Sequence, residues 1–202
     1  MPVLNESAYQ GDWLVDEFSP PNYCRTEINV LAPVDIPSGT VIGLATTLTS
    51  FYAPYDNAGG ANTGKSAAAA GIALNTIEAN PPVAVSIVDV ADAAGVGTGT
   101  TIEEHCLVVG DIIGVFGATD ADLNVYAAIA SVPTTKTFTI VTASVTDATY
   151  SCYYRKLNHA TVGLLRGPAV VANLDWGTCD STGLTAGKAE LLALQIVIRE
   201  EV

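Results

Sequence analysis

Residues 25–46 read RTEINVLAPVDIPSGTVIGLAT, and this stretch decides the fold class. Apolar and polar residues alternate in its first half, which is the period of a strand with one buried face. The Pro-Ser-Gly sequence at residues 37–39 predicts a turn, and a second apolar run begins at Thr40. The stretch therefore predicts two short strands that form a β-hairpin or a β-arch.

The composition of the whole chain also favours strands. Val, Thr, Ala and Gly are abundant, whereas Lys and Arg together number 8 among 202 residues. Hydrophobic residues make up 49 % of the chain and charged residues 14 %. Because so few charges are available to cover the surface, we expect apolar surface of this chain to lie against another chain.

The formal net charge is −13, and no Lys or Arg occurs between Lys65 and Lys136. Binding to a nucleic-acid duplex relies on cationic side chains that neutralise phosphates, so we expect no nucleic-acid partner. An acidic surface suits a protein that must stay soluble at high local concentration.

No membrane or export segment is expected. No apolar run reaches the roughly 18 residues of a membrane span, and the start, MPVLNESAYQGDW, lacks the basic and apolar regions of a secretory signal. We therefore expect synthesis and retention in a cytoplasm. The four cysteines lie far apart and form no C-x-x-C pair, which favours structural thiols over disulfides or a metal site.

The chain is expected to have three parts. Residues 1–24 contain several aromatic side chains among Pro, Gly and Asn, which predicts an extended arm that its own core or a neighbouring subunit must cover. Residues 25–82 and 157–202 form the main β domain. Residues 83–156 contain short β runs separated by turn residues, which predicts an inserted small β-barrel or sandwich.

One short helix is expected near the C-terminus. Residues 185–194 are rich in Ala and Leu behind the possible cap Thr185. The segment LQIVIREEV, residues 194–202, then reads as a final strand. The predicted fold class is therefore mainly β with one helix.

The octapeptide GGANTGKS at residues 59–66 matches the phosphate-binding pattern G-x-x-x-x-G-K-S. In a nucleotide hydrolase, Lys65 would contact the terminal phosphate oxygens and Asp89 would orient the metal ion. The preceding residues, FYAPYDNA, do not read as a buried aliphatic strand, and Gly71 interrupts the helix that should follow. We therefore expect a flexible loop, with a nucleotide hydrolase built on Lys65 as the less favoured alternative.

The sequence offers no other catalytic or metal-binding pattern. Glu103, Glu104, His105 and Cys106 are consecutive, and neighbouring residues of a strand point to opposite faces, so they cannot all reach one ion. His159 stands alone, and the carboxylate pairs Asp120 with Asp122 and Asp16 with Glu17 lie in expected loops. No nucleophile has a recognisable base motif around it. We expect no catalytic residue, no metal and no cofactor, and hence no enzyme.

Several segments, taken in order, carry a family resemblance: INVLAPVDIPSGTVIGLAT, YAPYDNAGG, SAAAAGIAL, VGLLRGPAVVANLDW and ALQIVIREEV. Together they resemble tailed-phage head decoration (capsid cement) proteins of the lambda D type over about 110 residues, an extent at which order and spacing matter more than any one motif. The central block is similar to small β modules of other phage structural proteins, in which an H-x-L-x-x-G-D turn precedes the strands.

The resemblance implies a β-tulip-like domain, a homotrimer, and a place on the outer surface of the capsid after synthesis in the host cytoplasm. It also implies that the N-terminal arm adds a strand to the major capsid protein, an arrangement in which aromatic side chains fill pockets. The candidate capsid contacts lie in the arm and in the turn at residues 35–40: Trp13, Leu14, Val15, Phe18, Tyr23, Asp35, Ile36 and Pro37.

A binding module is the main alternative. In that case the inserted domain attaches the virion to glycans of a host or of its surroundings, and its tyrosines are the natural stacking residues. They are Tyr126, Tyr150, Tyr153 and Tyr154. This alternative is compatible with a decoration protein.

Overall fold

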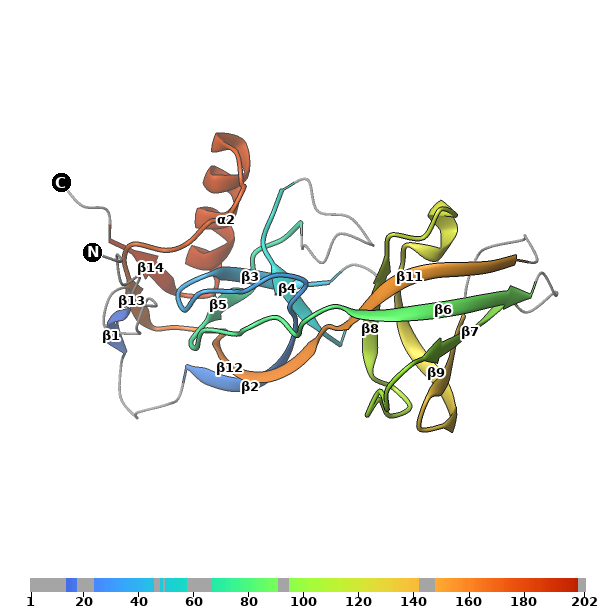
Figure 1. Cartoon of the computed structure of the whole chain (residues 1–202). Helices are drawn as coiled ribbons and strands as arrows, with labels where there is room; N and C mark the ends of the chain where they lie inside the picture. Colours follow the sequence, from blue (N-terminus) through green and yellow to red (C-terminus); the bar gives the residue numbers. More distant parts are fainter. Residues whose placement is uncertain are drawn as a thin grey trace, which may run out of the picture. The chain divides into compact units, whose positions relative to one another are not determined.

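A computed structural model describes residues 14–17, 24–45, 48, 50–57, 67–90, 95–141 and 148–199 (Figure 1). The chain divides into two compact units. The outer unit comprises Met1–Ala79 and His159–Val202, and the inserted unit comprises Asn80–Asn158. The predicted insertion, residues 83–156, lies within the second of these.

The described residues are mainly β, as predicted, with two closed barrels and one α-helix. No described helix has the length and apolar character needed to cross a bilayer.

The outer unit contains a closed five-stranded barrel in the order β12-β2-β4-β3-β5. Its strands are β2 (Arg25–Leu31), β3 (Val41–Leu44), β4 (Tyr52–Pro54), β5 (Gly71–Ala73) and β12 (Asn158–Leu164). Strand β4 lies between β2 and β3, pairing parallel to the former and antiparallel to the latter. The stretch at residues 25–46 therefore supplies two strands, as predicted, but these strands do not form a hairpin with each other.

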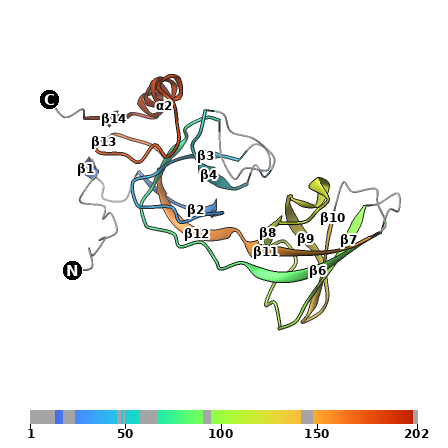
Figure 2. The same ribbon diagram turned by 45° about the horizontal axis from the view of Figure 1, so that its top comes forward.

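A three-stranded sheet completes the outer unit. Strand β1 (Leu14–Glu17) pairs antiparallel with β13 (Ala169–Val171), and β13 pairs parallel with β14 (Ile196–Ile198). Helix α2 (Ser181–Ala193) lies beside β14 in both ribbon views (Figures 1 and 2).

The helix begins earlier than predicted. The expected cap, Thr185, lies inside α2, and its hydroxyl donates to the Ser181 carbonyl at 2.9 Å. The observed cap is Asp180, whose carboxylate accepts a hydrogen bond from the Gly183 amide at 2.8 Å. Sequence reasoning missed this start because Asp180 is followed by Ser, Thr and Gly, which favour turns as readily as a first helical turn.

The helix packs on the barrel through glycines. Gly187 faces Trp176 and Tyr55, whose rings meet edge to face with centroids 6.1 Å apart. The hydroxyl of Tyr55 donates to the Gly183 carbonyl at 2.8 Å. Burial raises the pKa of Tyr55, and the Glu190 carboxylate raises it further. The absence of side chains at the two glycines lets the helix backbone approach the aromatic rings closely.

The inserted unit is a closed six-stranded barrel in the order β10-β7-β6-β11-β8-β9, with every pairing antiparallel (Figure 2). Its strands are β6 (Val83–Val90), β7 (Val96–Thr101), β8 (Ile112–Phe116), β9 (Tyr126–Thr134), β10 (Thr137–Val141) and β11 (Ala148–Lys156), with a 3-10 turn η1 (Ala121–Leu123). Of the two expected architectures, barrel and sandwich, the described strands form the barrel.

Phe138 is fully buried in the core of the inserted unit. Its ring lies over Gly99 of β7 and contacts Tyr154 edge to face, with centroids 5.3 Å apart. Strand β7 reads VGTGTT and has little apolar alternation. It forms a strand because its glycine makes room for this ring, a reason that is absent from its local sequence.

Candidate functional site

The described part of the predicted arm is paired within its own chain. Leu14 lies opposite Val171, and Glu17 lies opposite Ala169. Of the two expected covers for the arm, its own core and a neighbouring subunit, the described strand has the first, because β13 of the same chain pairs with one side of it. Strand β1 is nevertheless one of the two edge strands of its sheet, the other being β14. Of the other candidates in the arm, Val15 is described only by its backbone in β1, and Trp13, Phe18 and Tyr23 lie outside the described residues.

The arm also ends earlier than predicted. Cys24 was assigned to the arm, but it is fully buried in the core of the outer unit. Its carbonyl accepts a hydrogen bond from the Leu165 amide at 3.2 Å, and its thiol donates to the Pro168 carbonyl at 3.6 Å. Half-buried Leu14 packs against the same cluster. These contacts place both ends of the described arm against the chain's own barrel.

The turn at residues 35–40 is held by its polar groups. The Ser38 hydroxyl donates to the Leu74 carbonyl at 2.7 Å. The Thr40 hydroxyl lies 2.8 Å from the Pro37 carbonyl and 3.0 Å from the Asp175 carboxylate. Between them, Gly39 has a φ of 88°, which favours glycine. Each residue of the Pro-Ser-Gly-Thr motif therefore has a structural role in closing the barrel.

The capsid-contact candidates in this turn have different exposures. Ile36 is 1 % exposed, and its backbone pairs with that of Ile77. It is a core residue, so its side chain cannot be a contact in the folded chain. Asp35 and Pro37 are exposed, and the Asp35 carboxylate accepts a hydrogen bond from the Ala79 amide at 2.9 Å.

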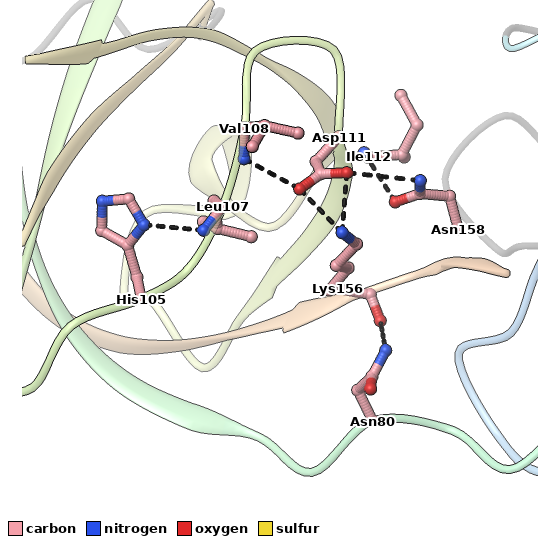
Figure 3. Close-up of polar contacts among 8 residues, drawn as sticks. All are labelled: Asn80, His105, Leu107, Val108, Asp111, Ile112, Lys156 and Asn158. Atoms are coloured by element: carbon pink, nitrogen blue, oxygen red, sulfur yellow. Dashed lines mark hydrogen bonds and ion pairs between the residues drawn. The ribbon is translucent and has the colours of Figure 1, made fainter. Parts of the chain in front are cut away.

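A polar cluster in the inserted unit surrounds Asp111 (Figure 3). This carboxylate is 5 % exposed and forms an ion pair with Lys156 at 2.8 Å. It also accepts hydrogen bonds from the Val108 amide at 2.9 Å and from the Asn158 side chain at 3.4 Å. Burial alone would raise the pKa of Asp111, but the hydrogen bonds from Lys156 and Val108 outweigh burial and lower it.

The cluster joins the two ends of the inserted unit. The side chain of Asn80, its first residue, donates to the Lys156 carbonyl at 2.9 Å. The side chain of Asn158, its last residue, accepts a hydrogen bond from the Ile112 amide at 3.1 Å. The side chains of Asn80, Asp111, Lys156 and Asn158 each have a protein partner in the same unit, so the arrangement indicates a clamp on the barrel ends (Figure 3).

His105 also belongs to this loop. Its Nδ1 accepts a hydrogen bond from the Leu107 amide at 3.0 Å (Figure 3). Its ring contacts Phe138 edge to face. Together with Asp111, it explains the H-x-L-x-x-G-D pattern as a loop that binds its own amides. No group of three metal-ligating side chains occurs among the residues that the structure describes.

One of the carboxylates noted in the sequence, Asp120, has a structural role. Asp120 accepts a hydrogen bond from the Asp122 amide at 2.9 Å and caps η1. None of the four cysteines, all of which are described, forms a disulfide, and two of them are buried in the cores. Burial raises the pKa of the Cys152 thiol.

The four tyrosines proposed for glycan stacking do not share one face. Tyr154 is 3 % exposed and points into the barrel core. Tyr150 packs against the same core, and its hydroxyl donates to Asp120 at 3.3 Å. Tyr126 is half-buried beside Gly114. Tyr153 is half exposed. In the folded chain, buried Tyr154 therefore cannot stack on a ligand, whereas Tyr153 can.

The octapeptide at residues 59–66, with Lys65, lies outside the described residues. The residues after it, 67–70, are not helical, and β5 begins at Gly71. The proposed metal-orienting residue, Asp89, lies in β6 between paired strands β7 and β11. The neighbouring structure thus lacks the helix on which a phosphate-binding loop depends.

No protein-family model matches this sequence, and a search of curated proteins gives no significant match. The resemblance to head decoration proteins therefore rests on the sequence motifs quoted above.

Proposed function

We propose that this protein is a structural protein of a tailed-phage virion that binds the outside of the head as a trimer and stabilises the expanded shell. The segments that resemble decoration proteins supply all the outer-unit strands except β1, which precedes them. They are distant in sequence, and their convergence on one unit supports their origin as one domain.

The observation that carries the proposal is the position of β1. It is the first of the described strands and one of the two edge strands of its sheet, β14 being the other. An edge strand presents main-chain groups that another chain can pair with, which is the basis of strand addition. The major capsid protein would supply that strand, and residues 1–13 would add contacts beside it.

Self-association has separate support from α2. Its exposed surface includes Ala186, Ala189 and Ala193, which recur at helical spacing, and Leu192, which is 61 % exposed. Val197 of the adjacent strand β14 is 47 % exposed. Apolar surface of this kind is favourable to bury against another copy. Three copies in one trimer would multiply the avidity of weak capsid contacts.

The first test is the mass of the purified protein in solution. Native mass spectrometry should give three times the 20.8 kDa of one chain. Replacing Leu192 with Asp should shift the population toward monomer, whereas replacing the exposed Val141 of the inserted unit with Asp should not. A monomeric wild-type protein would contradict the trimer.

The second test is binding to heads. The proposal requires a major capsid protein gene beside the gene for this chain, and expanded heads assembled from that protein should co-sediment with this chain. Deleting residues 1–13 keeps β1 and should weaken co-sedimentation without changing the far-ultraviolet circular dichroism spectrum. Full binding by this variant would show that residues 1–13 add no contact to the shell.

A further inference from the structure

We infer that the inserted unit binds a neutral glycan in a groove on the outer face of its barrel, across β7, β6 and β11. The groove has a volume of about 300 Å³, at the lower end of the range for small-molecule sites. Its lining residues are Ala84, Val85, Ser86, Thr100, Ile102, Ser151, Cys152 and Tyr153. This inference is independent of the proposed capsid role.

The strand register explains the hollow. Tyr153 of β11 lies opposite Ala84 of β6, and Ile102 directly follows β7. Tyr153 is 50 % exposed and Ile102 is 77 % exposed, whereas Ala84 has only a methyl group between them. Two large side chains thus stand on either side of a small one on the same face of the sheet.

A row of hydroxyls forms the next rung of the same face. Ser151 lies opposite Ser86, and Ser86 lies opposite Thr100. Within the described residues, these three side chains have no hydrogen-bond partner. Each can donate one hydrogen bond and accept two, so the row offers both donors and acceptors to a ligand.

The aromatic wall is held in place. Tyr153 stacks on Phe116 of the neighbouring strand β8, with ring centroids 6.0 Å apart and an angle of 19° between the rings. The guanidinium of Arg155 lies 6.0 Å from the centroid of Phe116. A ring that is already positioned costs less to order when a ligand stacks on it.

These features favour a sugar over other ligands. None of the eight lining side chains is charged, so the groove does not suit a phosphate or a nucleic acid. Strands β6, β7 and β11 each have partners on both sides, so their main chains are not open to an added peptide strand. A sugar ring presents C–H groups to an aromatic ring and hydroxyls to Ser and Thr, which matches both rows.

The test uses the full chain on an array of immobilised neutral oligosaccharides, with sialylated and sulfated glycans on the same array. The neutral glycan with the strongest signal is then titrated by calorimetry. Replacing Ala84 with Phe fills the hollow and should weaken binding at least about tenfold, as should Tyr153→Ala, which removes the stacking ring. Ala128→Phe, at an exposed position of β9 on the same barrel, is the matched control and should bind as the wild type does.

Binding of neutral glycans that A84F and Y153A lose and A128F keeps would support the inference. No binding to any neutral glycan, binding only to anionic glycans, or unchanged binding by A84F and Y153A would each overturn it. Thermal unfolding of each variant identifies misfolding. If A84F is unfolded, glycan binding by Y153A alone tests the inference. Both variants should still co-sediment with heads, so failure of the glycan site and failure of the capsid role are distinguishable.

Discussion

The ammonium of Lys156 lies 2.8 Å from each carboxylate oxygen of Asp111. Asp111 directly precedes β8, and Lys156 is the last residue of β11, so the pair connects two neighbouring strands of the inserted barrel. Because Asn80 binds the carbonyl of the same lysine, the cluster ties the entry and exit of this unit together.

Replacing Asp111 with Asn should destabilise the inserted unit by about 1–3 kcal/mol, because the amide retains the size of the carboxylate but leaves a partly buried lysine without its counter-charge. Urea unfolding of the full chain, followed by circular dichroism, measures the change. Asp122→Asn, at an exposed position of the same unit, is the control and should have little effect. Equal stabilities of the two variants would contradict the clamp.

The same pair makes stability depend on pH. The folded-state pKa of Asp111 is lowered, so its contribution is complete above the unfolded-state pKa of about 3.8 and is lost as the pH falls through the folded-state value. The unfolding free energy of the wild type should therefore fall more steeply below about pH 4 than that of D111N. Urea titrations at a series of pH values would measure both curves. Parallel curves would show that Asp111 has an ordinary pKa.

Replacing Gly187 with Ala should destabilise the outer unit, although alanine favours a helix. The added Cβ would lie 2.6 Å from Cζ3 of Trp176 and 3.0 Å from Cε1 of Tyr55. Overpacking of this kind costs about 1–3 kcal/mol, more than the gain in helix propensity of about 1 kcal/mol. Thermal unfolding measures the change, with Thr182→Ala at an exposed position of α2 as the control. A higher midpoint for G187A would disprove close packing here.

Gly99 and Phe138 should be energetically coupled. A Cβ on Gly99 would lie 2.5 Å from Cζ of the fully buried Phe138 ring. Gly99→Ala alone should lower the free energy of unfolding by about 1–3 kcal/mol. Adding Phe138→Leu should recover part of that loss, because the smaller side chain leaves room for the new methyl group. A double-mutant cycle from urea unfolding gives the coupling energy. Additive effects would mean that the two residues do not meet.

Local alternation was enough to predict a mainly β chain, the two strands within residues 25–46 and the central β runs, because the side-chain period of a strand is a property of neighbouring residues. Two strands of the inserted unit lack a clear apolar alternation. β7 has glycine and threonine in place of apolar residues, and β11 has a run of aromatic and polar residues.

The candidate sites could be predicted from the sequence less well than the strands, because they depend on which strands become neighbours. Sequence reasoning named four tyrosines as stacking residues, but Tyr154 points inward while Tyr153 points outward, as the alternation along β11 requires. It did not find the hydroxyl row of Ser86, Thr100 and Ser151, because these residues become neighbours only through the register of three strands. The sequence did contain one signal for this groove. Ala84 and Ser86 are two residues apart, as are Ser151 and Tyr153, so the members of each pair lie on the same face of their strand.

Composition and alternation thus specified which segments become strands and that they would bury apolar faces. Only the tertiary structure decided that β4 separates β2 from β3, that β1 pairs with β13, and that Asp111 meets Lys156. These partners are far apart in sequence. Strand pairing depends on the summed burial and hydrogen bonding of the whole barrel, and no local pattern contains that sum.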